Sequence, residues 1–419
     1  MSRPAPAAVT PARSWRTCCE RPWGAGTTRS ACWGTCGTTC RGRPRTTRGR
    51  HRTRTSWSGT APCPRTWTRP GGGSTRLRPK RSWVIATGGR WLRTRRPPLR
   101  SGPEADRVRQ LHSDELPIDV PLVRRLVDRT FPEYAGHDLT PLRDSGSSSA
   151  LFRLGDDLLV RLPRQPGGGA TIDKEMQWLP FVGSRTSFAI PRVIGIGEPD
   201  LGYSERWAIT QWLDGTSATP PQSGPGPGSS SRAPAGLAQD LAQFVTELRT
   251  MEVPSEAADD ESLEWYRGLP LASLDLDYRE AAAECRGLDL ALDIDEALRV
   301  WDRAVEASFA AGATVGWYHG DLLAENLLLN DAGRLAAVLD FGGLGIGNPT
   351  VDLIVAWEVL DAEGRRELRR ALDVDDATWT ASRGWALLIA MITFPYYGAT
   401  MPRRCADRLA MAQAAIATT

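Results

Sequence analysis

The sequence predicts an α+β fold of two lobes, in which a small antiparallel β-sheet precedes a larger, mostly helical part. Its 419 residues suffice for two or three domains of ordinary size. Strand-like stretches gather in residues 112–213, and amphipathic helical stretches dominate residues 214–419. A small strand-rich half joined to a helical half predicts two lobes with a cleft between them.

The first hundred residues differ in composition from the rest of the chain. They hold 22 Arg, one Lys and one acidic residue, a net charge of +22, whereas residues 101–419 hold 29 basic and 48 acidic residues, a net charge of −19. Residues 1–104 also contain seven Trp without helical or strand period, and few aliphatic side chains. Such a segment cannot bury enough apolar surface to offset its chain entropy, so we expect it to form no folded domain.

Three interpretations of residues 1–104 remain open. The segment is disordered or a wrong-frame or wrong-start translation of GC-rich DNA, a basic tail that binds nucleic acid through its phosphates and bases, or a metal site on Cys32, Cys36 and Cys40. The metal interpretation is the weakest, because no second Cys or His pair follows at a zinc-finger spacing. Peptides between Trp15 and Trp91, found by mass spectrometry of the natural protein, would exclude the translation error.

The sequence predicts no membrane helix and no secretion signal. Its longest apolar run, residues 385–392, is shorter than the roughly 18 residues that a membrane helix needs, and it predicts a buried helix of a water-soluble core. The N-terminus lacks a charged-then-apolar signal pattern, so we expect a cytoplasmic location. Cys285 and Cys405 are widely separated and are expected to be reduced thiols.

Apolar periodicity and turn residues predict the elements of the two lobes. Asp119 is a candidate N-cap for the first helix, and Gly155 begins a turn between two strands. Residues 219–234 are rich in Pro, Gly and Ser, which predicts a flexible loop. The predicted elements are helices over residues 120–127, 171–179 and 237–248, and strands over residues 150–154, 158–162 and 208–213.

The strongest chemical signal is His319-Gly-Asp-Leu-Leu-Ala-Glu-Asn326, followed by Val338-Leu-Asp-Phe-Gly-Gly343. Transfer of a phosphoryl group to a hydroxyl needs a carboxylate to hold and deprotonate the acceptor, and oxygen ligands for magnesium. Asp321, Asn326 and Asp340 supply these groups in the order that kinases use, and their oxygens suit a hard cation such as Mg²⁺. An Asp-Phe-Gly turn alone is ordinary, but the joint pattern indicates phosphoryl transfer from ATP.

Residues 112–419 resemble the aminoglycoside phosphotransferase family, which shares the protein-kinase-like fold. The resemblance includes Arg267-Gly-Leu-Pro-Leu271 and the stretches 317–329 and 340–353. It also extends to Leu111-His-Ser-Asp-Glu115, because the family often begins with Met-His-x-Asp-Glu. An alternative start codon at Leu111 would explain the unusual leader, which is a hypothesis.

The resemblance implies roles for the residues of both motifs. Asp321 would be the catalytic base, Asn326 and Asp340 would hold Mg²⁺, and Asp352 would brace the catalytic loop. We expect His319 to orient that loop through hydrogen bonds and not to transfer protons.

The small lobe contains candidate residues for the nucleotide site whose sequence signals are less specific. Kinases place a cation on the third strand, paired with a helical glutamate, and the matching pair here is Arg161 and Glu175. The segment 144–149 predicts a loop that lays amide groups over the phosphates, and residues 211–213 match the hinge that binds adenine through its backbone. The candidate nucleotide-binding residues are Ser145, Gly146, Ser147, Arg161, Glu175, Gln211 and Leu213.

The expected acceptor is an aminoglycoside-like antibiotic, whose phosphorylation gives resistance. The acidic surplus of residues 101–419 favours a polycation, although an acidic surface also serves solubility. A macrolide or a metabolite as acceptor remains an alternative, because fold analogy does not fix a substrate. A nucleic-acid-binding protein acting through the basic tail, and a catalytically inactive kinase-like binding module, are the competing classes of function.

Overall fold

The computed structural model describes residues 81–86, 90–95, 108–142, 146–220, 234–312 and 314–417. Within the Arg-rich segment, strands β1 (Arg81–Ala86) and β2 (Arg90–Arg95) form an antiparallel pair. The sequence analysis named no strand there, although both stretches contain the aromatic and branched residues that favour strands. The remainder of residues 1–104, including the cysteines, lies outside the described residues.

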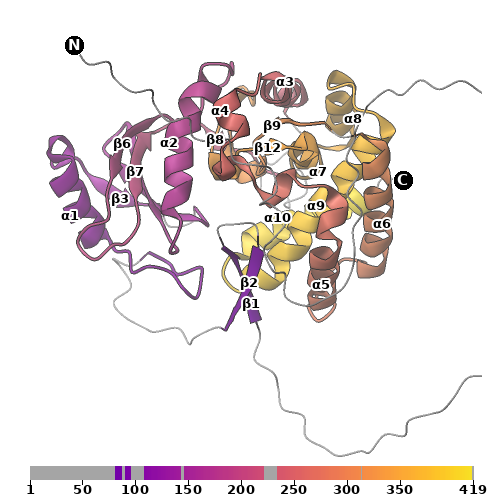
Figure 1. Ribbon diagram of the computed structural model, residues 1–419, viewed down its shortest axis with the longest axis horizontal. Coiled ribbons are helices and arrows are strands. Elements are labelled where there is room, and N and C mark those ends of the chain that lie inside the picture. The colour runs from indigo at the N-terminus through magenta and orange to yellow at the C-terminus, as the bar shows by residue number, and fades with distance from the viewer. Residues whose placement is uncertain are drawn as a thin grey trace, which may run out of the picture. The chain divides into compact units, whose positions relative to one another are not determined.

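A five-stranded antiparallel sheet forms the small lobe, with the strand order β3-β4-β5-β7-β6 (Figure 1). The predicted strands at 150–154 and 158–162 are confirmed as β4 and β5, and Gly155 turns between them with a φ of +58°. The predicted strand at 208–213 is shorter and ends at Gln211, because its partner strand begins opposite it at Leu158. The strands are β3 (Leu139–Pro141), β4 (Ser149–Leu154), β5 (Leu158–Pro163), β6 (Val193–Gly197) and β7 (Trp207–Gln211).

Two helices accompany this sheet, and both were predicted. Helix α1 (Val120–Thr130) begins at Asp119, whose carboxylate accepts a hydrogen bond of 2.8 Å from the amide of Leu122. Its apolar side joins Phe152 and Trp207 in the core of the small lobe. Helix α2 (Gly169–Gly183) lies between the sheet and the helical lobe (Figure 1), so it is placed to carry residues into the cleft.

The large lobe is mostly helical and holds the larger hydrophobic core. The predicted helix at 237–248 is confirmed as α3, and residues 385–392 lie in the buried middle of α9. The described part of the predicted loop, residues 219, 220 and 234, belongs to no helix or strand. The helices are α3 (Leu237–Thr250), α4 (Ser255–Ala258), α5 (Asp275–Cys285), α6 (Ile294–Ala310), α7 (Ile354–Val359), α8 (Ala362–Ala371), α9 (Asp376–Tyr397) and α10 (Pro402–Ala417).

Short strands of the large lobe bring its two chemical motifs together. Strand β9 pairs with β12, which places the residues after Tyr318 beside those before Gly345. Strand β10 pairs with β11 and with β8, and its register sets Leu327 opposite Val338. The end of the first motif therefore lies beside the start of the second, and the start of the first lies beside the end of the second. These strands are β8 (Thr216–Ser217), β9 (Gly316–Tyr318), β10 (Leu327–Leu329), β11 (Leu335–Val338) and β12 (Gly345–Gly347).

Candidate active site

The loop after β9 is held by a dense set of buried hydrogen bonds. The Asp352 carboxylate accepts bonds from the backbone amides of His319, at 2.8 Å, and Gly320, at 2.7 Å. His319 is fully buried, and burial lowers the pKa of its imidazole, which is therefore neutral. Its Nδ1 accepts from the amide of Asp321 at 3.2 Å, so its Nε2 donates to the carbonyl of Leu339 at 3.0 Å. These contacts support the predicted bracing roles of Asp352 and His319.

Asp321 follows this loop and faces a cavity with part of its side chain, which is 27% exposed. The Asn326 amide donates to the Asp321 carboxylate at 3.1 Å and to its carbonyl at 2.8 Å. Burial alone would raise the pKa of Asp321, but Arg267, and then Arg408 and Arg404, outweigh it and lower the pKa to about 2. The carboxylate is therefore ionised at neutral pH.

Arg267 is a site residue that the sequence analysis missed. Its guanidinium contacts the Asp321 carboxylate and the carbonyl of Gly320, and it donates to the Tyr266 hydroxyl at 3.0 Å. It also lies over the Trp265 ring, 4.6 Å from the centroid. Arg267 thus holds one oxygen of the Asp321 carboxylate, and Asn326 holds the other. Its position at the start of the quoted Arg-Gly-Leu-Pro motif was the available signal.

Replacing Arg267 by Met is expected to lower kcat and to make it fall toward acid. In the natural protein the pKa of Asp321 is about 2, so this carboxylate stays ionised over the usual assay range. Without Arg267, burial is opposed only by the remaining cations, Arg408 and Arg404, so the pKa of Asp321 rises from about 2. The protonated carboxyl cannot accept a proton, so activity is lost as pH falls. Profiles of kcat between about pH 5 and 8 test this; superimposable profiles would contradict it.

Asp340 opens the second motif in a conformation that few residues adopt. Its φ is +58°, in the left-handed region, where an aspartate is tolerated better than most side chains. Its carboxylate accepts a bond of 3.4 Å from the Gly342 amide and is half-exposed toward the same cavity as Asp321. The structure therefore brings both aspartates to one cavity.

Asn326 and Asp340 offer a donor set that fits Mg²⁺. The Asn326 amide nitrogen makes its two bonds to Asp321, which leaves its oxygen free for other contacts within the described residues. No group of three or more His, Cys, Asp or Glu side chains suited to a metal occurs among the described residues. Two oxygen ligands completed by phosphate oxygens and water are how proteins commonly bind Mg²⁺.

Arg161 on β5 and Glu175 on α2 form a buried bidentate ion pair. The two guanidinium nitrogens lie 2.6 and 3.1 Å from the carboxylate oxygens, and the side chains are 8% and 1% exposed. Arg161 also lies 3.8 Å from Asp340. Burial opposes the charge of Arg161, yet Glu175 and Asp340 together raise its pKa. The predicted pair is therefore placed beside the candidate metal ligand.

The sequence predicts a helical position for Lys174, the neighbour of Glu175, and no contact of its side chain with the second motif. Its ammonium donates to the carbonyls of Gly342, at 2.7 Å, and Leu344, at 2.9 Å. Burial lowers its pKa to about 8, although Glu175 and Asp340 oppose the shift. Lys174 therefore ties α2 of the small lobe to the turn that follows Asp340.

The predicted phosphate loop is described only in part, because Ser145 lies outside the described residues. Gly146 has a φ of +72°, and a Cβ there would clash with the Ser149 carbonyl, so the position requires glycine. Ser147 and Ser148 line the cavity. The carbonyls of residues 146 and 148 accept bonds from Arg164, at 3.0 and 2.9 Å. The phosphate contact itself stays a prediction.

The hinge residues do not line this cavity. Gln211 is exposed, and its amide donates to the Arg192 carbonyl at 2.9 Å, while the Trp212 amide donates to Asp157 at 2.7 Å. Both amides are therefore used within the small lobe. The predicted adenine contact would fall to Leu213 or to a carbonyl of this stretch, and it stays a prediction.

Two arginines of α10 form ion pairs with acidic residues next to the loop at residues 319–326. Arg408 contacts Glu358 and lies 2.6 Å from Glu325, and Arg404 lies 3.2 Å from Glu325. Glu358 in turn accepts from the Ala324 amide at 2.7 Å. No local pattern predicts this network, because Arg408 contacts residues that are 50 and 83 positions away in the sequence.

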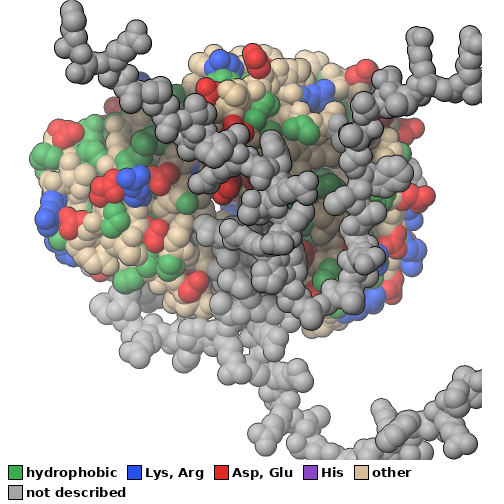
Figure 2. Space-filling view, viewed as in Figure 1, with side chains coloured by type: hydrophobic (Ala, Val, Ile, Leu, Met, Phe, Trp, Pro, Cys, Tyr) green, Lys and Arg blue, Asp and Glu red, His purple; other side chains and the backbone are tan. Residues whose placement is uncertain are grey.

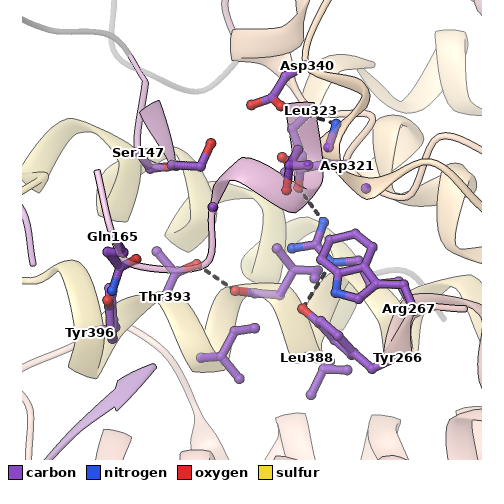
Figure 3. Close-up of a pocket in the computed structure, with 18 of the residues that line it drawn as sticks. Ser147, Gln165, Tyr266, Arg267, Asp321, Leu323, Asp340, Leu388, Thr393 and Tyr396 are labelled. Atoms are coloured by element: carbon purple, nitrogen blue, oxygen red, sulfur yellow. Dashed lines mark hydrogen bonds and ion pairs between the residues drawn. The ribbon is translucent and has the colours of Figure 1, made fainter. Parts of the chain in front are cut away.

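The two motifs border a cavity of about 900 Å³ between the loop at residues 146–148, the start of α2 and the large lobe (Figure 3). One wall is apolar and is formed by Leu388, Ile389 and Ile392 of α9. The lining also includes three acidic residues, Glu261, Glu264 and Asp277. Such a cavity holds a drug-sized molecule.

Comparisons with known proteins identify the family and the fold of this chain. A model of the phosphotransferase enzyme family matches residues 138–385. The GDP complex of wild-type aminoglycoside 2'-phosphotransferase-IIIa is similar to this chain with a TM-score of 0.52 and 19% identity, over 71% of this chain and 98% of that one. A mutant of that enzyme, also a GDP complex, has a TM-score of 0.50 and 19% identity, over 70% and 94%. The likeness to these two structures confirms the predicted two-lobed, protein-kinase-like fold.

A macrolide 2'-phosphotransferase type I also matches, with a TM-score of 0.49 and 17% identity, over 71% of this chain and 97% of that one. The comparison with curated proteins gave no match.

Among the described helices, none has the length and apolar character to cross a membrane.

Proposed function

Because the chain belongs to the phosphotransferase enzyme family, whose model matches residues 138–385, we propose that it transfers the γ-phosphoryl group of ATP to a hydroxyl of an aminoglycoside-like antibiotic. The observation that carries the proposal is that Asp321 and Asp340 line one cavity, with Arg161 3.8 Å from Asp340. This arrangement supports a donor phosphate on one side of the aspartates and an acceptor hydroxyl on the other. The reaction would give resistance in the cytoplasm, where ATP is available.

Asp321 would hold the acceptor hydroxyl and receive its proton. With a pKa of about 2, it is a weak base toward a free alcohol. Phosphoryl transfer passes through a loose transition state, in which the attacking hydroxyl becomes acidic only as the new O–P bond forms. Asp321 would therefore act mainly by orienting the hydroxyl, with Arg267 fixing the carboxylate, and would take the proton late in the reaction.

The donor end would use charges from both lobes. Arg161, held by Glu175, would contact the phosphates from β5, and the loop at residues 146–148 would add backbone amides. Asn326 and Asp340 would hold Mg²⁺, which when bound neutralises the triphosphate and stabilises the charge that moves onto the leaving group.

The acceptor end offers negative charge where a cation would bind. Glu264 and Asp277 line the cavity, and within the described residues neither forms an ion pair. Burial, followed by the nearby Glu280, raises the pKa of Asp277, so a cationic ligand would relieve an unfavourable charge there. On the face in Figure 2, acidic and basic side chains are interspersed over the described surface, so selectivity for a cation would come from the cavity itself.

A macrolide is the second candidate acceptor. The apolar wall formed by Leu388, Ile389 and Ile392 is suited to a largely apolar molecule with few amines. A polycation would leave that wall without an apolar partner.

The test is a coupled assay of the full chain with magnesium-ATP or magnesium-GTP and a panel of aminoglycosides, macrolides and small alcohols. We expect acceptor-dependent release of the nucleoside diphosphate, and mass spectrometry should show one added phosphoryl group on the acceptor. Resistance of a sensitive bacterium expressing the chain would extend the result to cells. Turnover with neither antibiotic class would contradict the proposed acceptor, and no turnover with any acceptor would contradict the proposed reaction.

Replacing Asp277 by Asn is expected to raise KM for a cationic aminoglycoside about tenfold or more, because a charge-assisted hydrogen bond is lost. KM for a macrolide should change less, and kcat little in either case. Asp289→Asn is the matched control, since Asp289 is exposed and lies outside the cavity. Equal effects of the two substitutions would show that Asp277 does not bind the acceptor.

A further inference from the structure

A buried histidine ahead of the small lobe, His112, joins three separate parts of the chain at the edge of the cavity. Its side chain is 6% exposed. Its Nε2 lies 2.6 Å from the carbonyl oxygen of Ser147, in the loop at residues 146–148. Its Nδ1 lies 2.6 Å from the hydroxyl of Tyr396, near the C-terminal end of α9. The histidine therefore links the loop of the small lobe to a helix of the large lobe.

The partners of His112 fix its tautomer. A carbonyl oxygen only accepts hydrogen bonds, so Nε2 carries the proton and donates to Ser147. Nδ1 then accepts from the Tyr396 hydroxyl. Both bonds use the neutral imidazole, and burial lowers its pKa against the opposing effect of the Ser147 bond and of Glu115. Each ring nitrogen therefore has one hydrogen-bond partner, and the two bonds hold the imidazole ring in one orientation.

A second set of contacts secures the segment that carries His112. The Glu115 carboxylate accepts from the backbone amides of Leu111, at 2.7 Å, and His112, at 3.0 Å. Arg164, which is almost fully buried, lies 3.3 Å from Glu115 and donates to the Gly146 carbonyl at 3.0 Å. The segment and the loop are thus held against each other by backbone and side-chain bonds.

The Tyr396 end of the link is equally well supported. Gln165 lies beside Tyr396 (Figure 3), and its side chain donates to Asp114 at 2.8 Å. The next residue on α9, Tyr397, lines the same cavity, and its ring meets that of His112 edge-on, with the two centroids 6.0 Å apart. His112 therefore contacts two adjacent tyrosines of the large lobe, and it is bonded to the loop through the Ser147 carbonyl.

We propose that His112 is a positioning residue for phosphoryl transfer. It bonds the loop at residues 146–148 to Tyr396 and so determines the position of that loop relative to the cavity. The proposal rests on the proposed function, in which amides of this loop contact the donor phosphates. A phosphate displaced by about 1 Å from its aligned position reacts up to about a hundredfold more slowly. The side chain of His112 touches neither reacting group in this account and acts through the loop.

The first experiment measures hydrogen–deuterium exchange of the full chain without nucleotide. Exchange in peptides that contain residues 146–151 should become faster in His112→Ala and in Tyr396→Phe than in the natural protein. Tyr396→Phe removes only a hydroxyl, so it keeps the test valid if His112→Ala folds poorly. His137→Ala, at an exposed histidine of the small lobe, is the matched control and should leave these peptides unchanged. Unchanged exchange in both test variants would overturn the proposal.

The second experiment measures turnover of magnesium-ATP by the same variants. His112→Ala and Tyr396→Phe should each lower kcat about 10- to 100-fold with a smaller change in KM for ATP, and the double variant should resemble the more impaired single variant. His112→Gln keeps an N–H donor for the Ser147 carbonyl, so it should be closer to the natural protein than His112→Ala. Fully additive losses would overturn the proposal. Absence of turnover in the natural protein would contradict only the proposed function, because the exchange experiment still decides whether His112 holds the loop.

Discussion

Replacement of Asp321 by Asn is expected to lower kcat by about 10²- to 10⁴-fold, the range found when a general base is removed. The amide keeps the size of the side chain and a partner for Asn326, but it cannot accept the proton of the acceptor. KM for ATP should change little, because Asp321 lies on the acceptor side of the phosphates in the proposed arrangement. Initial rates of nucleoside diphosphate release at saturating acceptor measure the effect.

Two controls separate catalysis from folding in this variant. Asp331→Asn changes a matched aspartate in the exposed turn after β10 and should leave kcat intact. Thermal unfolding of Asp321→Asn shows how far the loss of the partner of Arg267 weakens the fold. A properly folded Asp321→Asn variant with turnover near that of the natural protein would remove Asp321 from the catalytic role.

Replacement of Arg161 by Met is expected to lower both stability and activity. The substitution leaves the Glu175 carboxylate buried without its cation, and breaking a buried pair in this way costs about 3–5 kcal/mol of unfolding free energy. It also removes the charge 3.8 Å from Asp340 that would contact the donor phosphates. Urea unfolding measures the first effect, and kcat/KM for ATP measures the second.

The double variant Arg161→Met with Glu175→Met distinguishes the two effects. Two apolar side chains of similar volume often restore the stability lost when a buried pair is broken. We therefore expect the double variant to regain most of the unfolding free energy and to stay impaired in kcat/KM for ATP. Recovery of activity together with stability would show that the pair serves only the fold.

Local patterns in the sequence were sufficient to predict the two lobes and the central strands and helices. The turn at Gly155 and the cap at Asp119 depend on neighbours within a few residues, so their signals are local. The boundary of β7 was missed because β7 ends opposite the first residue of its antiparallel partner β5, which is remote in the sequence. The hairpin of β1 and β2 was missed for a different reason. The Arg-rich composition of the whole segment argued against folded structure, although two short stretches in it contain strand-forming residues.

The sequence by itself determined the chemistry that this protein carries. The spacing of Asp321, Asn326 and Asp340 follows from the short loops and strands that hold them, because β9 pairs with β12 and β10 pairs with β11 close to both motifs. The pairing of Arg161 with Glu175 was predicted from the arrangement in kinases, in which a cation on the third strand pairs with a helical glutamate.

Only the tertiary structure decided which groups surround that chemistry. Arg267 reaches Asp321 across 54 positions, Lys174 reaches Gly342 across 168, and His112 reaches Tyr396 across 284. No periodicity or motif links residues so far apart, because their contacts arise from the packing of one lobe and one helix against another. The candidate carboxylates could be named from the sequence, whereas the packing determined the pKa of Asp321 and the contacts of the loop at residues 146–148.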